Sequence, residues 1–173
     1  MVQSKTNSGL LTPKRQARID GILDVALELL ANNGLEGMSM HRVAGALDLT
    51  VGALYRYFDN KGAMIAALER RVFREYGDEL QRVVLDPPVP DSGAGEAVDL
   101  LVPIARLSLA YGALSFSKPA HMQLINEVLA NPAHLLSPDE AHHVIATMFE
   151  VFLPFESLFQ RAADGGALMS TIW

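Results

Sequence analysis

The segment 39–61, SMHRVAGALDLTVGALYRYFDNK, constrains the fold more than any other part of this 173-residue chain. It reads as two short helices joined by a tight turn, with Ser39 and Thr50 placed to cap them through their hydroxyls. Apolar residues recur at the spacing that packs two helices together, namely Val43, Ala44, Leu47, Leu49 and Leu54. The pattern predicts a helix-turn-helix whose second helix enters a DNA groove.

The turn and the second helix carry the details that favour DNA. Asp48 falls where a left-handed backbone is expected, which Asp tolerates better than most residues that have a Cβ. With Leu54 facing inward, Val51, Gly52 and Tyr55 fall on or beside the opposite face of the helix. The alternative is an ordinary helical hairpin inside a bundle. Two tyrosines and an arginine together on one short helix favour the DNA interpretation over that alternative.

Two segments, 34–44 (GLEGMSMHRVA) and 49–58 (LTVGALYRYF), followed by Lys61, resemble the TetR family of bacterial transcriptional regulators. The resemblance covers residues 14–75 well and the remainder in outline. It implies base contacts from His41, Val51 and Gly52. It implies phosphate-backbone contacts from Ser39, Met40, Thr50, Ala53, Tyr55, Tyr57 and Lys61, with Gly52 and Ala53 nearest the groove floor. The chain departs from the family pattern at Asp48, where glycine is usual, and at Met40, where a hydroxyl residue is frequent.

The formal net charge of −6 is unevenly distributed. Residues 1–74 hold 10 Lys and Arg against 7 Asp and Glu, a balance of +3, whereas residues 75–173 hold 4 against 13, a balance of −9. Residues 1–18 carry Lys5, Lys14, Arg15 and Arg18 without an acid. Because salt screens exposed charges beyond about 8–10 Å, the local field decides whether phosphate is attracted. The basic stretch is either a DNA-contacting arm or a solvated tail.

Helical spacing of apolar residues predicts an all-α protein. We expect a flexible basic arm over 1–12, a three-helix DNA-binding head over 13–60 and a connecting helix over 61–85. A Pro/Gly-rich linker over 86–95 then leads to a helical effector-binding and dimerisation body over 96–173. Thr12 and Pro13 mark the start of the first helix, and Asn33-Gly34 marks its end. Helices are predicted in the body over 96–116, 119–130 and 138–163.

The body is rich in large apolar side chains, which suit an effector site for a small apolar molecule. The candidate residues are Tyr111, Phe116, Met122, Phe149, Phe152, Phe155 and Phe159. Plain core or a subunit interface is the commoner role for any one of them. Pro154 is expected to kink its helix between Phe152 and Phe155, which would help to open a pocket.

Several function classes lack the residues they need. The chain has no cysteine, which excludes disulfides and thiolate sites. Asp139, His142 and His143 are too few for a metal site, and no catalytic constellation emerges, so we expect neither enzyme activity, cofactor nor metal. The apolar run Leu100–Phe116 contains a proline and an arginine and is expected to fall short of a membrane span. Without a signal-peptide core at the N-terminus, a cytoplasmic location is expected.

One recognition helix reads only a few base pairs, so selective binding requires two heads about 34–36 Å apart, or a multiple of that. We therefore expect a homodimer on a roughly palindromic operator of double-stranded DNA. The resemblance implies repression relieved by an effector that tilts the connecting helix. The family usually dimerises through two further C-terminal helices, so the body is shortened, the 138–163 helix forms the interface, or the chain is a fragment. Alternatives are a DNA-binding protein without an effector and a helical protein-interaction module.

Overall fold

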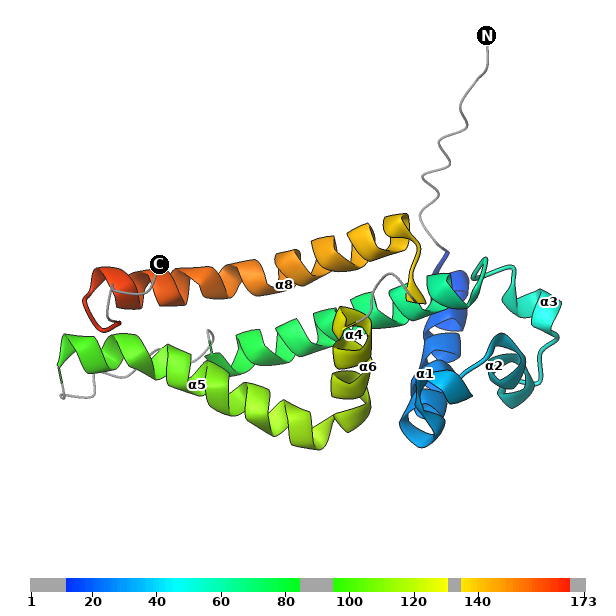
Figure 1. The fold of residues 1–173 in the computed structure, drawn as a ribbon, viewed down its shortest axis with the longest axis horizontal. Coiled ribbons are helices and arrows are strands. Elements are labelled where there is room, and N and C mark those ends of the chain that lie inside the picture. The colour runs from blue at the N-terminus through cyan, green and yellow to red at the C-terminus, as the bar shows by residue number, and fades with distance from the viewer. Residues whose placement is uncertain (1–11, 85–94, 131–134, 169–173) are drawn as a thin grey trace, which may run out of the picture. The chain divides into compact units, whose positions relative to one another are not determined.

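The computed structural model describes residues 12–84, 95–130 and 135–168, apart from the side chain of residue 97. The chain divides into two compact units, Met1–Asp59 and Asn60–Trp173 (Figure 1). The described residues form helices without strands, so the all-α prediction is confirmed for this part of the chain. The expected arm and linker lie outside the described residues, except for Thr12 and Gly95.

The first unit consists of α1 (Pro13–Gly37), α2 (Met40–Ala46) and α3 (Val51–Leu54). Each helix is capped as predicted, because the hydroxyls of Thr12, Ser39 and Thr50 accept from backbone amides at 3.3, 3.3 and 3.2 Å. α1 kinks where the sequence predicted its end. Gly34 adopts φ 66° there, and the helix then continues for one further turn.

The α2–α3 turn has the predicted left-handed residue, because Asp48 adopts φ 52°. The helices it joins are closely packed, with Val43, Ala44 and Leu54 each no more than 1% exposed. Phe58, which follows α3, is also buried at 6% exposure. The apolar spacing in the sequence thus identified the inner face of this hairpin.

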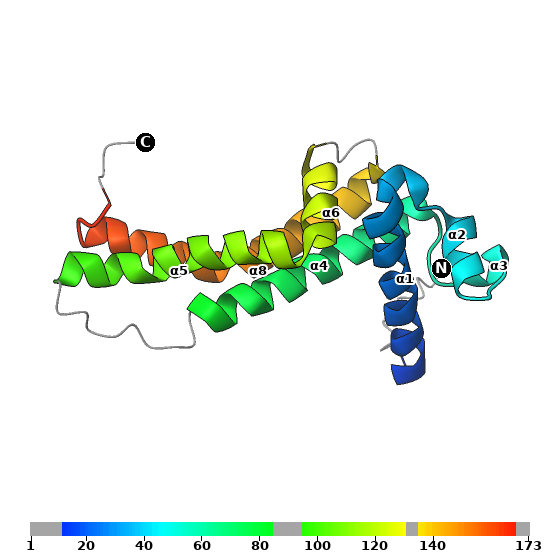
Figure 2. The same ribbon diagram turned by 90° about the horizontal axis from the view of Figure 1, so that it is seen from below.

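The second unit contains α4 (Lys61–Val84), α5 (Glu96–Ser117), α6 (Pro119–Ala130) and α8 (Pro138–Asp164). Figures 1 and 2 show α4 and α8 side by side along most of their lengths. Gly77 permits this close approach, since a Cβ at that position would overlap the Val151 side chain. The three helices predicted for the body correspond to α5, α6 and α8, whose bounds lie within one or two residues of those expected.

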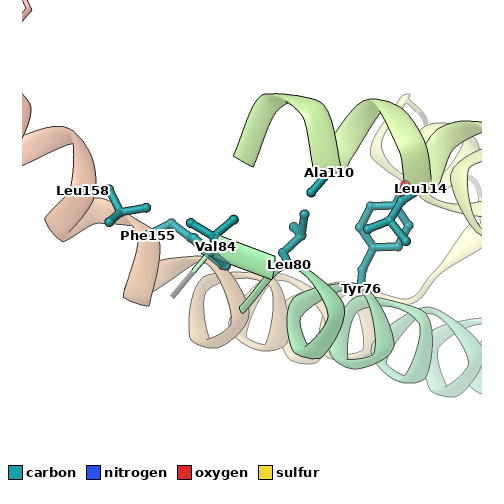
Figure 3. Packing of buried hydrophobic residues seen from close by; sticks show 7 residues of the cluster. All are labelled: Tyr76, Leu80, Val84, Ala110, Leu114, Phe155 and Leu158. Atoms are coloured by element: carbon teal, nitrogen blue, oxygen red, sulfur yellow. The ribbon is translucent and has the colours of Figure 1, made fainter. Parts of the chain in front are cut away.

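A cluster of buried side chains joins α4 to α5 and α8 (Figure 3). Its members are Tyr76, Leu80, Val84, Ala110, Leu114, Phe155 and Leu158. α8 begins with a capping box between Ser137 and Glu140 and continues through Pro154 to Asp164. α4 therefore shares a common core with α5 and α8.

The apolar character of α5 exceeds the sequence expectation. Its Val98–Ser117 stretch has a mean hydropathy of 1.4 and is long and apolar enough, by length and composition, to cross a membrane. The expectation that this run falls short of a span is thus wrong on those two measures, because Asp99 and Arg106 are the only two charged residues in the stretch. Ala110 and Leu114 nevertheless pack into the common core with α4 and α8, as the core-facing residues of a globular protein do.

Candidate nucleic-acid interface

The residues implied as base contacts lie at the surface of the first unit. His41 at the start of α2 and Gly52 in α3 are exposed, and Val51 is half-buried. Tyr55, at the end of α3, has 48% of its surface exposed, while Leu54 beside it is fully buried. A Cβ added at Gly52 would meet no atom within 4 Å, so internal packing does not require a glycine there. The outer face of α3 is therefore small and open, as close approach to a groove requires.

The capping hydroxyls remain able to bind phosphate. Ser39 and Thr50 each use an oxygen lone pair to accept an amide hydrogen bond, which leaves the hydroxyl proton free to be donated. Ala53 is half-buried between them and the core. These positions are compatible with the implied phosphate contacts, which remain predictions.

Met40 does not fit its implied role. Its side chain is buried, with 6% of its surface exposed, and it packs as a core residue. A thioether enclosed in apolar surroundings cannot reach a phosphate. The structure therefore corrects the implied side-chain contact from this position. Lys61 begins α4 in the second unit, so its phosphate contact stays a prediction.

A basic basin of about 680 Å³ lies beside Tyr57 in the first unit, and the motif alone did not reveal it. It is lined by Thr12, Lys14, Arg15, Ala17, Arg18 and Tyr57. The Arg15 guanidinium lies 5.1 Å from the centroid of the Tyr57 ring and donates to the Arg56 carbonyl at 3.1 Å. This stacking holds the cation beside the C-terminal end of the recognition segment.

The basin has the chemistry of a phosphate site, since three cations line it without an acidic residue. The acid-free composition of residues 1–18 was the sequence signal for it. Arg42 has a different role. Its two terminal nitrogens donate to the Gly37 carbonyl at 2.7 Å and to Asn33 Oδ1 at 3.1 Å, which ties α2 to the end of α1.

Comparison with known proteins places this head in a family. Residues 22–68 match the model of bacterial regulatory proteins of the tetR family, a region that spans most of α1 to the first part of α4. This region of the chain is therefore similar to the DNA-binding part of tetR-family regulators. The transcriptional repressor DrrR1 of Streptomyces coeruleorubidus is 37% identical over 62 residues, which are 36% of this chain and 23% of that protein.

A second repressor, KstR of Mycolicibacterium smegmatis, is 31% identical over 85 residues, covering 49% of this chain and 42% of that protein. The matches thus span less than half the length of these curated relatives. A TetR-family regulator from Vibrio parahaemolyticus has a similar structure, with a TM-score of 0.64 and 22% identity over 85% of this chain and 71% of its own.

A family member from Shewanella sp. PV-4 gives a TM-score of 0.60 at 18% identity over 86% of this chain and 71% of its own. At such identities the two solved structures establish a shared fold and no more. The TetR-like architecture expected from the sequence is therefore confirmed.

The body places the candidate effector residues in two different environments. Phe152 packs against Phe155, with ring centroids 6.4 Å apart, and Met122 is partly buried against the same core. Tyr111 is half-exposed and its hydroxyl donates to Met122 Sδ at 3.6 Å. In contrast, three of the phenylalanines are largely exposed: Phe116 at 90%, Phe149 at 63% and Phe159 at 44%. Exposure favours an interface role for these three.

An open groove of about 380 Å³ runs between α4 and α5. It is lined by Glu79, Val83, Arg106, Leu109, Ala110, Ala113, Leu114 and Ser117. None of the seven candidate effector residues contributes to it. The sequence did not indicate this groove because its walls come from helices separated by the 86–95 segment.

A charged link joins α6 to α4. His121 Nε2 lies 3.1 Å from Glu75 Oε2, and Arg71 Nε donates to Glu75 Oε1 at 2.8 Å. Burial would raise the pKa of Glu75, but the hydrogen bonds from Arg71 and His121 outweigh it and lower that pKa. Among the described residues, no three His, Asp or Glu side chains gather as a metal site.

Glu69 of α4 is the buried carboxylate in this unit. It is fully buried, and neither carboxyl oxygen has a hydrogen-bond partner among the residues that the structure describes. Burial raises the pKa of Glu69 from 4.5 to about 8. The side chain is therefore protonated in the folded protein at neutral pH, when it would be ionised in the unfolded chain.

We expect Arg15→Gln to weaken binding to all DNA sequences by about tenfold, because it removes one charged hydrogen-bond donor from the basin. The slope of log affinity against log salt should fall by about 1. Filter binding at several salt concentrations measures both quantities. Arg161→Gln, an equal charge change on α8, serves as the control. Equal effects of the two substitutions would contradict a local phosphate contact.

Glu69→Gln should change how stability depends on pH. Between pH 4.5 and about 8 the unfolded chain releases the Glu69 proton while the folded chain keeps it, so stability falls as pH rises through this range. The Glu69→Gln variant has no carboxyl group at this position, so its stability does not fall for this reason. Its excess stability over the parent, measured by urea unfolding, should therefore grow by about 1–3 kcal/mol from pH 5 to pH 8. Parallel profiles would show that Glu69 ionises freely.

Proposed function

We propose that this chain is a sequence-specific transcriptional repressor that binds a roughly palindromic operator as a homodimer and is released by a small, largely apolar effector. The observation that carries the proposal is the open outer face of α3, with Val51, Gly52 and Tyr55 opposite the buried Leu54. An exposed tyrosine at the end of a four-residue helix adds little to the stability of the fold, so its exposure indicates contact with a partner. The match of residues 22–68 to tetR-family regulators supports DNA as that partner.

The exposed side of α8 supports dimerisation. Ile145, Phe149 and Leu153 recur every four residues and are 44%, 63% and 63% exposed. They lie on the side of the helix away from Val144 and Leu158, which are buried in the second unit. A continuous apolar stripe of this kind on a soluble helix marks an interaction surface. A second α8 related by twofold symmetry would cover it with the same residues.

An effector that changes the separation of the two heads by acting through α4 would complete the switch. A coupling free energy of about 1–3 kcal/mol lowers operator affinity roughly 5- to 150-fold, which is enough for regulation. Such a repressor would act in the cytoplasm, where its operator is. A DNA-binding protein without an effector, or a helical interaction module, remains the alternative to be tested.

Two pairs of substitutions separate affinity from specificity. Tyr55→Ala and Lys61→Ala should weaken binding to every DNA sequence alike, since they remove phosphate contacts. His41→Ala and Val51→Ala should instead relax the preferred sequence, because they act at base edges. Selection from a random DNA pool with each variant measures both effects. Unaltered binding by the Tyr55→Ala, Lys61→Ala double variant would contradict the phosphate roles, and no selected sequence from the parent would exclude an operator.

The α8 stripe can be tested separately. We expect the double variant Phe149→Glu, Leu153→Glu to sediment as a monomer, because facing carboxylates would be brought together across the twofold axis. Its operator affinity should fall by at least a hundredfold, since a single head reads too few base pairs. Leu129→Glu, an exposed apolar position on α6 at 50% exposure, serves as the control. A dimeric double variant would place the interface elsewhere.

A further inference from the structure

The carboxyl group of Glu69 is a feature of α4 that core packing does not explain. The side chains three and four residues before and after it, which share its face of the helix, are Ile65, Ala66, Val72 and Phe73, each no more than 1% exposed. All four are apolar. Neither Glu69 oxygen meets a hydrogen-bond donor in the described part of the chain. A polar group in such surroundings costs stability that an apolar residue of similar size would not cost.

Two polar side chains of this unit have other partners, whereas the buried Tyr76 hydroxyl, like Glu69, has none among the described residues. Thr147 on α8 is buried like Glu69, but its hydroxyl donates to the His143 carbonyl at 3.0 Å. Arg71, two residues along α4, pairs with Glu75 at 2.8 Å. The donor that would satisfy Glu69 is therefore absent from these contacts, and a molecule bound in the interior can supply it.

Further along α4, the side of the helix that carries Glu69 packs against α8 and α5. One turn further along, the Phe73 ring packs edge-on against Phe152 of α8, with centroids 6.3 Å apart. Two turns along, Tyr76 packs edge-on against Tyr111 of α5, also at 6.3 Å. Figure 3 shows Tyr76 beside Leu114 of α5. A molecule that reaches Glu69 would thus lie among aromatic and aliphatic side chains.

We propose that Glu69 anchors the effector and that the effector is an amphipathic amine, whose ammonium group pairs with the Glu69 carboxylate while its apolar body lies against Phe73 and Phe152. This inference rests on the proposed function and names the chemical class of its effector. A charge-assisted hydrogen bond is about twice as strong as a neutral one, and low-polarity surroundings strengthen it. The proton that Glu69 carries at neutral pH would leave when the ammonium binds. A neutral alcohol would gain less, and a carboxylate ligand would find no cation to pair with.

Entry of the apolar body would part the Phe73–Phe152 contact and so separate α4 from α8. α4 begins at Lys61, directly after the unit that ends at Asp59. A ligand held at Glu69 therefore acts on the helix to which the DNA-reading unit is attached.

Calorimetric titration of the full chain at pH 7 with three ten-carbon probes tests the proposal. Decylammonium should bind at least tenfold more tightly than 1-decanol or decanoate. Glu69→Gln should abolish this preference while keeping side-chain size. Glu79→Gln, on the same helix but beside Arg82 at the surface, should retain it. Glu69→Asp should keep the preference for the amine with weaker affinity, because the carboxylate remains.

Three results would overturn the proposal: equal binding of alcohol and amine, no binding of any probe, or an unchanged preference in Glu69→Gln. Circular dichroism and thermal unfolding verify that each variant is folded. Without a probe, the control Glu79→Gln should bind the selected operator like the parent. Failure of the proposed function would instead appear as loss of operator selection by the parent chain, whatever the probe titrations show.

Discussion

Helix α3 is too short to exist alone, and that constraint shapes the whole first unit. Four residues form barely one turn, which is far below the length at which an isolated helix is stable in water. α3 is therefore held by its surroundings. The Thr50 hydroxyl caps its first turn, Leu54 anchors it from beneath, and the left-handed Asp48 sets its direction after α2. Only with these three supports can its outer face be left to small and aromatic residues.

The two arginines near α3, Arg42 and Arg15, are held by different contacts. Arg42 is used inside the unit, where it ties α2 to α1 through two hydrogen bonds. Arg15 is stacked on Tyr57, which restricts the side chain but leaves its charge beside the basin. A cation that is positioned before it meets a phosphate loses less conformational entropy on binding. Both residues are arginines, and only their different partners in the fold give them different roles.

The second unit has the opposite character, since its core is apolar and its chemistry is concentrated in one buried carboxyl. Glu69 lies in the core where a leucine would be the stabilising choice, and natural proteins accept such costs mainly at functional sites. α4 carries this group, contributes Tyr76, Leu80 and Val84 to the common core, and begins where the DNA-reading unit ends. One helix therefore joins the proposed effector contact to the proposed DNA contact.

The sequence by itself determined the helices, their caps, the left-handed Asp48 and the inner face of the hairpin. These follow from hydroxyls, prolines and apolar spacing within a few residues of one another, so local physics suffices. Only the tertiary structure decided that Met40 is core, that Arg15 stacks on Tyr57, and that Glu69 has no hydrogen-bond partner among the described residues. Each of these three features depends on which side chains from distant positions in the chain come into contact in the fold, and which do not. The spacing of apolar residues predicts which face of a helix is buried, but not which side chains that face contacts.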